Sequence, residues 1–193
     1  MKQIGLTGGI GAGKSTVSQI FNCLGIPVYN SDLKSKKILL SNHLITKKII
    51  SILGKSILTS NKIDFKKMSK VIFANKIKLQ AINKILHHEV KKDYENWIKK
   101  QKGLYIIKES AIIFESKIES NFDKIIFVKS SQKTRINRII KRDNKNKKEI
   151  QNIIKNQMKS KEIYRRSHFT IINEHSNLLI PQVIKIHKKI INF

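Results

Sequence analysis

The sequence predicts an α/β fold in which a parallel β-sheet is sandwiched by helices. Several short apolar runs do not alternate between apolar and polar residues, as expected of strands that are buried on both faces. Segments with helical spacing of apolar residues separate these runs. The first run also leads through a glycine-rich loop directly into a helix, which is a connection typical of α/β proteins.

The glycine-rich loop is the most informative feature of the chain. It follows a strand expected over 2–7, and residues 8–16 read GGIGAGKST, which contains the phosphate-loop pattern G-x-x-x-x-G-K-[ST]. Backbone N–H groups of such a loop and the start of the next helix bind a polyphosphate anion. Lys14 is expected to reach the β- and γ-phosphates of ATP, and the Ser15 hydroxyl to bind Mg²⁺. The residues expected to bind ATP are Gly9, Gly11, Ala12, Gly13, Lys14, Ser15 and Thr16.

The elements after the loop follow from helix-stop and capping signals. Gly25 is expected to end the first helix, and a second strand is expected over 26–29. Ser31 or Asp32 can cap a helix over 33–40. Cys23, the one cysteine, is expected to be a small core residue.

The rest of the chain divides into a helical stretch and a second set of strands. From 43 to 102 the pattern is mostly helical with no strand, which is more than a crossover needs, so part of it is expected to be an inserted helical subdomain. A basic arm over 131–167 is expected to hold a soft segment from 143 to 148 and a helix from 149 to 161. The remaining expected elements are strands at 104–107, 125–128 and 169–172 and a C-terminal helix from Pro181 as its first residue.

The composition of the chain excludes fewer classes of function than the glycine-rich loop does. The chain has 193 residues and a net charge of +27, which by itself suggests a nucleic-acid partner. The basic residues are mostly lysines that are spread along the chain, so a solvated lysine surface is the favoured explanation. No run approaches membrane-spanning length, and the single cysteine fits a reducing cytosol, so a cytoplasmic location is expected.

Other polar residues are candidates for the chemistry of phosphoryl transfer. Asp32, near the end of the second strand, can accept a proton from an acceptor hydroxyl, although it can also be a plain helix cap. Glu109 ends a strand and can hold the water shell of a metal ion, and Glu115 is a second candidate after it. Arg138 and Arg142 lie one helical turn apart and can clamp phosphates, or can form a solvated face.

Several further segments of the chain match one known pattern. They are residues 4–17, the segments Leu86-His87 and Phe114-Glu115, and the set Gln132, Arg138, Arg142, Gln157 and 171–173. Through these residues the chain resembles, across essentially its whole length, the dephospho-CoA kinase family. The resemblance implies a P-loop NTPase fold with a core at 1–42, 103–130 and 168–193, an acceptor-binding helical insertion at about 43–102 and a mobile helical lid at about 131–167. It also implies that ATP phosphorylates the ribose 3′-hydroxyl of dephospho-coenzyme A in the last step of coenzyme A synthesis.

The resemblance assigns roles to individual residues. It implies Lys14, Asp32 and Arg142 as catalytic residues, and Arg138 and Asn173 as further ATP-binding residues. It also implies Asp32, His87 and Glu115 at the acceptor, and Ser15 and Glu109 at Mg²⁺. ATP and dephospho-CoA are then the only partners expected, with no specific nucleic acid, no membrane and a monomer or weak homo-oligomer.

The chain departs from the family pattern at four positions. Asn30, His88, Ala111 and His168 replace an aspartate, two prolines and an aspartate of that pattern, which puts fine positioning of the acceptor and adenine at risk. Two other function classes stay open. One is a different small-molecule or nucleotide kinase, and the other is an ATPase that acts on nucleic acid, which only the charge supports.

Overall fold

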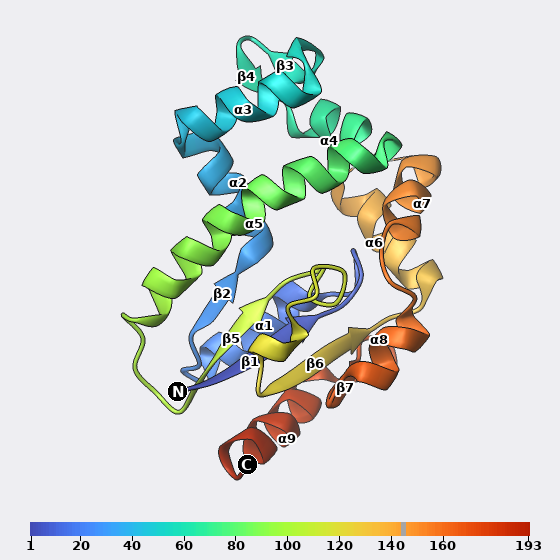
Figure 1. Ribbon diagram of the computed structural model, residues 1–193. Helices are drawn as coiled ribbons and strands as arrows, with labels where there is room; N and C mark the ends of the chain where they lie inside the picture. Colours follow the sequence, from blue (N-terminus) through green and yellow to red (C-terminus); the bar gives the residue numbers. More distant parts are fainter. Residues whose placement is uncertain (144–145) are drawn as a thin grey trace. The chain divides into compact units, whose positions relative to one another are not determined.

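The computed structural model describes residues 1–143 and 146–193. It divides into two compact units, the first formed by Met1–Asn30 and Gln101–Phe193, the second by Ser31–Lys100 (Figure 1). The expected helical insertion started at 43, whereas the second unit starts at Ser31. The physical reason is packing, because Leu39 belongs to the same apolar cluster as Ile45 and Ile49.

The first unit contains a five-stranded sheet in the order β2-β5-β1-β6-β7. All neighbouring strands pair in parallel, which confirms the predicted α/β fold. Parallel pairing brings the carboxyl ends of the strands to one edge, where ligands bind in such sheets. The strands are β1 (Lys2–Thr7), β2 (Val28–Asn30), β5 (Tyr105–Glu109), β6 (Lys124–Lys129) and β7 (Phe169–Ile172).

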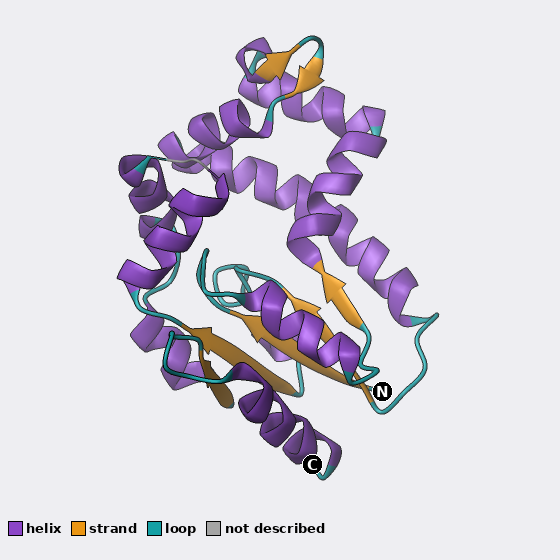
Figure 2. Ribbon diagram, turned by 180° about the vertical axis from the view of Figure 1, so that it is seen from behind, coloured by secondary structure: helices purple, strands orange, loops and turns teal. Residues whose placement is uncertain are grey.

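Helices cover both faces of this sheet. Alternate residues of β6 divide between two clusters: Ile126 and Val128 pack with α1 (Lys14–Cys23) and α9 (Leu179–Ile191). Ile125 and Phe127 belong instead to a cluster with α8 (Ser160–Arg166) and the segment after β5. Figure 2 shows α1 and α9 in front of the sheet. Burial on both faces explains why the strand sequences do not alternate.

The 131–167 arm contains α6 (Gln132–Asp143) and α7 (Lys147–Lys155) and ends in α8. The single helix expected over 149–161 is wrong, because Asn156 ends α7 and the Met158 N–H donates to the Glu115 carboxylate at 2.7 Å. Residues 144 and 145 of the expected soft segment lie outside the described residues. A short 3₁₀ helix, Glu119–Asn121, precedes β6.

The second unit is helical but contains a small hairpin, which corrects the prediction that no strand interrupts 43–102 (Figure 2). Ser60 and Asn61 form its two-residue turn, with φ of 48° and 60°. Two positive φ angles fit a type I′ turn, which Asn-Gly signals far more strongly than Ser-Asn does. The elements are α2 (Ser31–Ser41), α3 (His43–Leu53), the 3₁₀ helix Lys55–Ile57, β3 (Leu58–Thr59), β4 (Lys62–Ile63), α4 (Phe65–Ala74) and α5 (Lys76–Ile98).

Three local expectations also need correction. Ser31 and Asp32 do not precede α2 as caps but form its first residues. Cys23 is exposed rather than in the core, because it lies on the solvent side of α1. Pro181 is the third residue of α9, where it is tolerated because N–H groups of a first helical turn have no partner within the helix.

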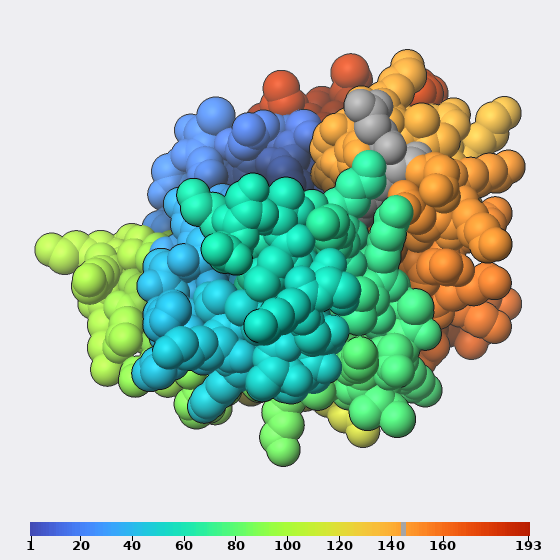
Figure 3. All heavy atoms as spheres, turned by 90° about the horizontal axis from the view of Figure 1, so that it is seen from above, coloured from blue at the N-terminus to red at the C-terminus, as the bar shows by residue number. Residues whose placement is uncertain are grey.

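Among the described residues, the buried lysines and arginines are Lys14, Lys108 and Arg135, so the other basic side chains reach the surface. Extended side chains stand out from the surface of the second unit in the space-filling view (Figure 3). Across residues 1–143 and 146–193, no helix is both long and apolar enough to cross a bilayer.

Candidate active site

The phosphate loop joins β1 to α1 at the carboxyl edge of the sheet. Gly13, the N-cap of α1, has φ 91° and ψ 28°, a left-handed conformation that favours glycine. Within the described part of the chain no side chain caps this helix, and its first turn contains no acidic residue. The N–H groups and the positive dipole end of α1 are therefore suited to an anion that does not come from the protein's own side chains.

Lys14 is held over the loop. Its side chain is buried, and Nζ donates a hydrogen bond to the Gly8 carbonyl at 3.0 Å. The ammonium is thus placed on the loop itself, on the motif's first residue. A polyphosphate in the loop would meet a cation that is already ordered, which reduces the entropy lost on binding.

Glu109, the last residue of β5, is the centre of a polar cluster beside the loop. It is 2% exposed, and its Oε2 accepts from Ser18 Oγ at 2.7 Å and from Asn30 Nδ2 at 2.9 Å. Its Oε1 lies 3.4 Å from the Ser15 hydroxyl. The structure therefore brings together Ser15 and Glu109, the two residues expected at the metal. Asn30 is one of the four positions at which the chain departs from the family pattern. Its amide donates to the Glu109 carboxylate, whereas an aspartate at this position would repel that carboxylate.

The other side of the loop is held by the end of β7 and by α6. Asn173 Nδ2 donates to the Ala12 carbonyl at 2.8 Å, and Asn173 Oδ1 accepts from Arg138 Nη2 at 3.1 Å. Ser130 Oγ donates to the Asn173 carbonyl at 2.7 Å. Arg138 and Asn173, both predicted at ATP, are thus joined to each other and to the loop.

Sequence reasoning gave no role to Arg135, which is nevertheless in direct contact with the loop. Its Nε donates to the Ile10 carbonyl at 2.8 Å, and its Nη2 donates to Gln157 Oε1 at 3.1 Å. The sequence offered one signal, the position of Arg135 one turn before Arg138 on the same helix. That signal does not distinguish a buried arginine from a solvated one.

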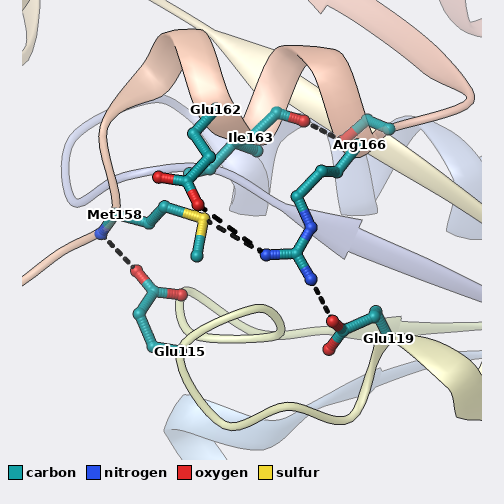
Figure 4. A network of polar contacts seen from close by, with 7 residues as sticks. Glu115, Glu119, Met158, Glu162, Ile163 and Arg166 are labelled. Atoms are coloured by element: carbon teal, nitrogen blue, oxygen red, sulfur yellow. Dashed lines mark hydrogen bonds and ion pairs between the residues drawn. The ribbon is translucent and has the colours of Figure 1, made fainter.

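Arg142 and Glu115 have other partners in this structure. Among the described residues, the Arg142 guanidinium bonds Asp143 with distances of 2.7 and 2.9 Å, and this hydrogen bond raises the pKa of Arg142. Glu115 Oε1 accepts from the Met158 N–H, and Glu115 Oε2 is buried without a hydrogen-bond partner among the described residues. Figure 4 shows Glu115 pointing toward Met158, and Arg166 reaching Glu119 from α8.

Asp32 and His87 belong to the second unit. Asp32 is exposed in the first turn of α2, two residues after Asn30 along the chain. His87 is exposed on α5. Both side chains are accessible for contact with a ligand.

A cavity of about 500 Å³ lies along α6 next to Arg138. A nucleoside base with its sugar is smaller than this volume, and pockets for small ligands begin at about 300 Å³. The cavity is lined by Lys133, Thr134, Asn137, Arg138, Ile140, Lys141 and His175.

The donor set beside the loop fits Mg²⁺ better than a transition metal. Ser15 and Glu109 offer oxygen atoms, which Mg²⁺ prefers, and it keeps several waters and binds substrate phosphates instead of a full protein cage. Among the described residues, no group of three or more His, Cys, Asp or Glu side chains could hold a metal ion. A site completed by phosphates and water is consistent with this observation.

Comparison with known proteins identifies the family. The dephospho-CoA kinase family model matches residues 2–178. A dephospho-CoA kinase of Bacteroides fragilis (strain YCH46) is 35% identical over 185 residues, which cover 95% of this chain and 90% of that protein.

One solved structure agrees with this result, and a second shares the fold. A dephospho-CoA kinase from Campylobacter jejuni has a TM-score of 0.67 and 26% identity, with 100% of this chain and 98% of that chain covered. TT1252 from Thermus thermophilus has a TM-score of 0.84 at 20% identity, with 97% and 96% covered, and shares the fold. With its phosphate loop, its parallel sheet and a family match over most of its length, the chain belongs to the dephospho-CoA kinase family of ATP-dependent kinases.

Proposed function

We propose that this protein transfers the γ-phosphoryl group of ATP to the ribose 3′-hydroxyl of dephospho-CoA, which gives coenzyme A and ADP. The observation that carries this proposal is the convergence of Lys14, Ser15 and Glu109 at one edge of the sheet, in a chain of this family. Transfer of a phosphoryl group needs mainly positioning and charge stabilisation, and these three side chains can supply both.

In the first unit, residues 9–16 bind the phosphates of ATP. Lys14 leaves the Gly8 carbonyl to contact the β- and γ-phosphates as a point charge. The cavity beside Arg138 and the adjacent Asn173 receive the adenosine part of ATP. When ATP binds, Arg142 releases the Asp143 carboxylate and contacts the transferring phosphoryl group instead. The positive charge of Arg142 then acts on that group.

The Ser15 hydroxyl would hold Mg²⁺, and the Glu109 carboxylate would hold its water shell. When bound, the ion neutralises charge on the phosphates. Ser18 and Asn30 orient Glu109 by donating to Oε2, so that Oε1 faces Ser15. Asparagine at position 30 donates to Glu109 Oε2, where a second carboxylate would repel it.

In the second unit, Asp32 orients the 3′-hydroxyl of the acceptor and accepts its proton. His87 binds the acceptor from the exposed face of α5. Glu115 of the first unit has one buried oxygen without a partner among the described residues, which can accept a hydrogen bond from the acceptor. The helical second unit is the acceptor-binding insertion and the 131–167 arm is the lid in this proposal.

The test is a coupled assay of ADP production with ATP, Mg²⁺ and dephospho-CoA. We expect turnover that depends on dephospho-CoA and is lost in Lys14→Ala by more than about a hundredfold in kcat, with little change in the melting curve. Other acceptor alcohols and added RNA or DNA serve as controls. Faster turnover with another alcohol, or hydrolysis of ATP that nucleic acid stimulates, would reject the proposal in favour of one of the two other function classes.

A further inference from the structure

Arg135 of α6 binds the phosphate loop at Ile10. Both polar backbone groups of Ile10 are bound: its carbonyl accepts from Arg135 Nε at 2.8 Å, and its N–H donates to Gln157 Oε1 at 3.0 Å. Gln157 Oε1 also accepts from Arg135 Nη2 at 3.1 Å. The three residues form a closed set of hydrogen bonds that joins the loop to two parts of the 131–167 arm.

The guanidinium of Arg135 packs directly on the loop. A methyl group at Gly9 would lie 2.2 Å from Arg135 Nη2 and 2.3 Å from Cζ, closer than real side chains approach. Glycine at position 9 therefore leaves room for the arginine, in addition to any freedom that it gives the backbone.

The charge on Arg135 has no ionic partner among residues 1–143 and 146–193. It is 7% exposed, and its hydrogen-bond partners among the described residues are a carbonyl and an amide, neither of which is charged. Burial lowers the pKa of Arg135, as expected of a cation that is desolvated without a carboxylate nearby. A buried cation of this kind is costly unless an anion compensates it.

We propose that Arg135 is a positioning residue for the triphosphate, which fixes the loop tip through Ile10 and Gln157 and supplies a buried positive charge that the bound polyphosphate compensates. The proposal rests on the proposed function only in taking ATP as the ligand of the loop. It differs from a purely structural role, in which Arg135 would pack the arm against the loop with no effect of its charge.

Gln157→Glu separates these two roles. The new carboxylate keeps an acceptor for the Ile10 N–H and for Arg135, so the hydrogen bonds survive, but it neutralises the buried cation. Gln151→Glu is the matched control, because it makes the same change of charge at an exposed position of α7. ATP and inorganic tripolyphosphate binding is measured by calorimetry for each protein, together with the melting temperature.

We expect Gln157→Glu to melt no lower than the wild type while it binds ATP and tripolyphosphate about tenfold more weakly, within the usual range of coupling between sites. Gln151→Glu should bind both ligands like the wild type. In the kinase assay, KM for ATP should rise and KM for dephospho-CoA should not change. Wild-type affinity in Gln157→Glu would overturn the proposal, because charge would then have no role.

A second pair of variants keeps the proposal testable if Gln157→Glu does not fold. Arg135→Lys keeps the charge and Arg135→Gln removes it, while both lose the guanidinium geometry. We expect the lysine variant to bind ATP about tenfold more tightly than the glutamine variant. Equal affinities would overturn the proposal. Failure of the proposed function is distinguishable, since the wild type would then bind ATP without phosphorylating dephospho-CoA.

Discussion

A methyl group at Gly13 would disturb the loop in a way that can be worked out from the structure. Gly13 has φ 91°, where a residue with a Cβ costs about 1–2 kcal/mol. The added Cβ would also lie 2.0 Å from Asn173 Nδ2, so this side chain has to move. The Asn173 side chain would lose its hydrogen bonds to the Ala12 carbonyl and to Arg138, and each lost bond costs about 1 kcal/mol. Gly13→Ala should therefore lower the free energy of unfolding by about 3–4 kcal/mol.

Gly25 provides the matched control. Its φ is 78°, but a Cβ there would meet no atom of the other described residues within 4 Å, its two chain neighbours aside, so Gly25→Ala should cost only the backbone strain of about 1–2 kcal/mol. Urea unfolding followed by circular dichroism measures both, and calorimetry measures the affinity for ATP, which only Gly13→Ala should weaken. In an Asn173→Ala background the cost of Gly13→Ala should fall to that of Gly25→Ala, since the clash is gone. Equal costs at the two glycines in the wild-type background would refute the reasoning.

The remaining predictions concern the proposed base and the effect of pH. Asp32→Asn should leave the melting temperature and ATP affinity nearly unchanged and lower kcat by at least about a hundredfold, since asparagine cannot accept the proton; a stable variant with normal kcat would remove Asp32 from the mechanism. Desolvation and, second, Lys124 lower the pKa of His168, whose Nδ1 accepts from the Ile125 N–H at 3.1 Å. The stabilising effect of neutral His168 is present above the ordinary pKa of 6.5 and decreases as the pH falls below it. The free energy of unfolding in urea should therefore be lower at pH 5.5 than at pH 7.5, and this loss should be smaller in His168→Gln. Identical losses in the two proteins would contradict this.

The strands and the first helix could be predicted because their signals are local. The apolar runs at β1, β5 and β6 are mostly buried on both faces, whereas β7 is an edge strand on which Ile172 is exposed. Gly25 follows α1 in a left-handed conformation with φ of 78°. Such features depend only on residues that are close together in the sequence, so they can be predicted from it.

The prediction failed where a contact from elsewhere in the chain decides the local structure. The break between α7 and α8 accompanies a hydrogen bond from Met158 to Glu115, 43 residues away. The hairpin of the second unit depends on a Ser60-Asn61 turn whose residues adopt positive φ without the glycine that would have revealed it. Exposure of Cys23 depends on which side of α1 meets the sheet, and residue 23 lies at the end of that helix.

The active site shows the same division between local and distant determinants. The motif identifies which backbone groups face a phosphate, but the groups that face away from it need partners, and these come from far along the chain. Arg135 is 125 residues from Ile10, Gln157 is 147 residues from it, and Asn173 is 161 residues from Ala12. Because unpaired buried backbone groups are costly, the loop can hold its shape only after α6, the α7–α8 connection and β7 have packed against it. The phosphate-binding geometry is therefore a property of the complete first unit, although its sequence signature occupies only eight residues.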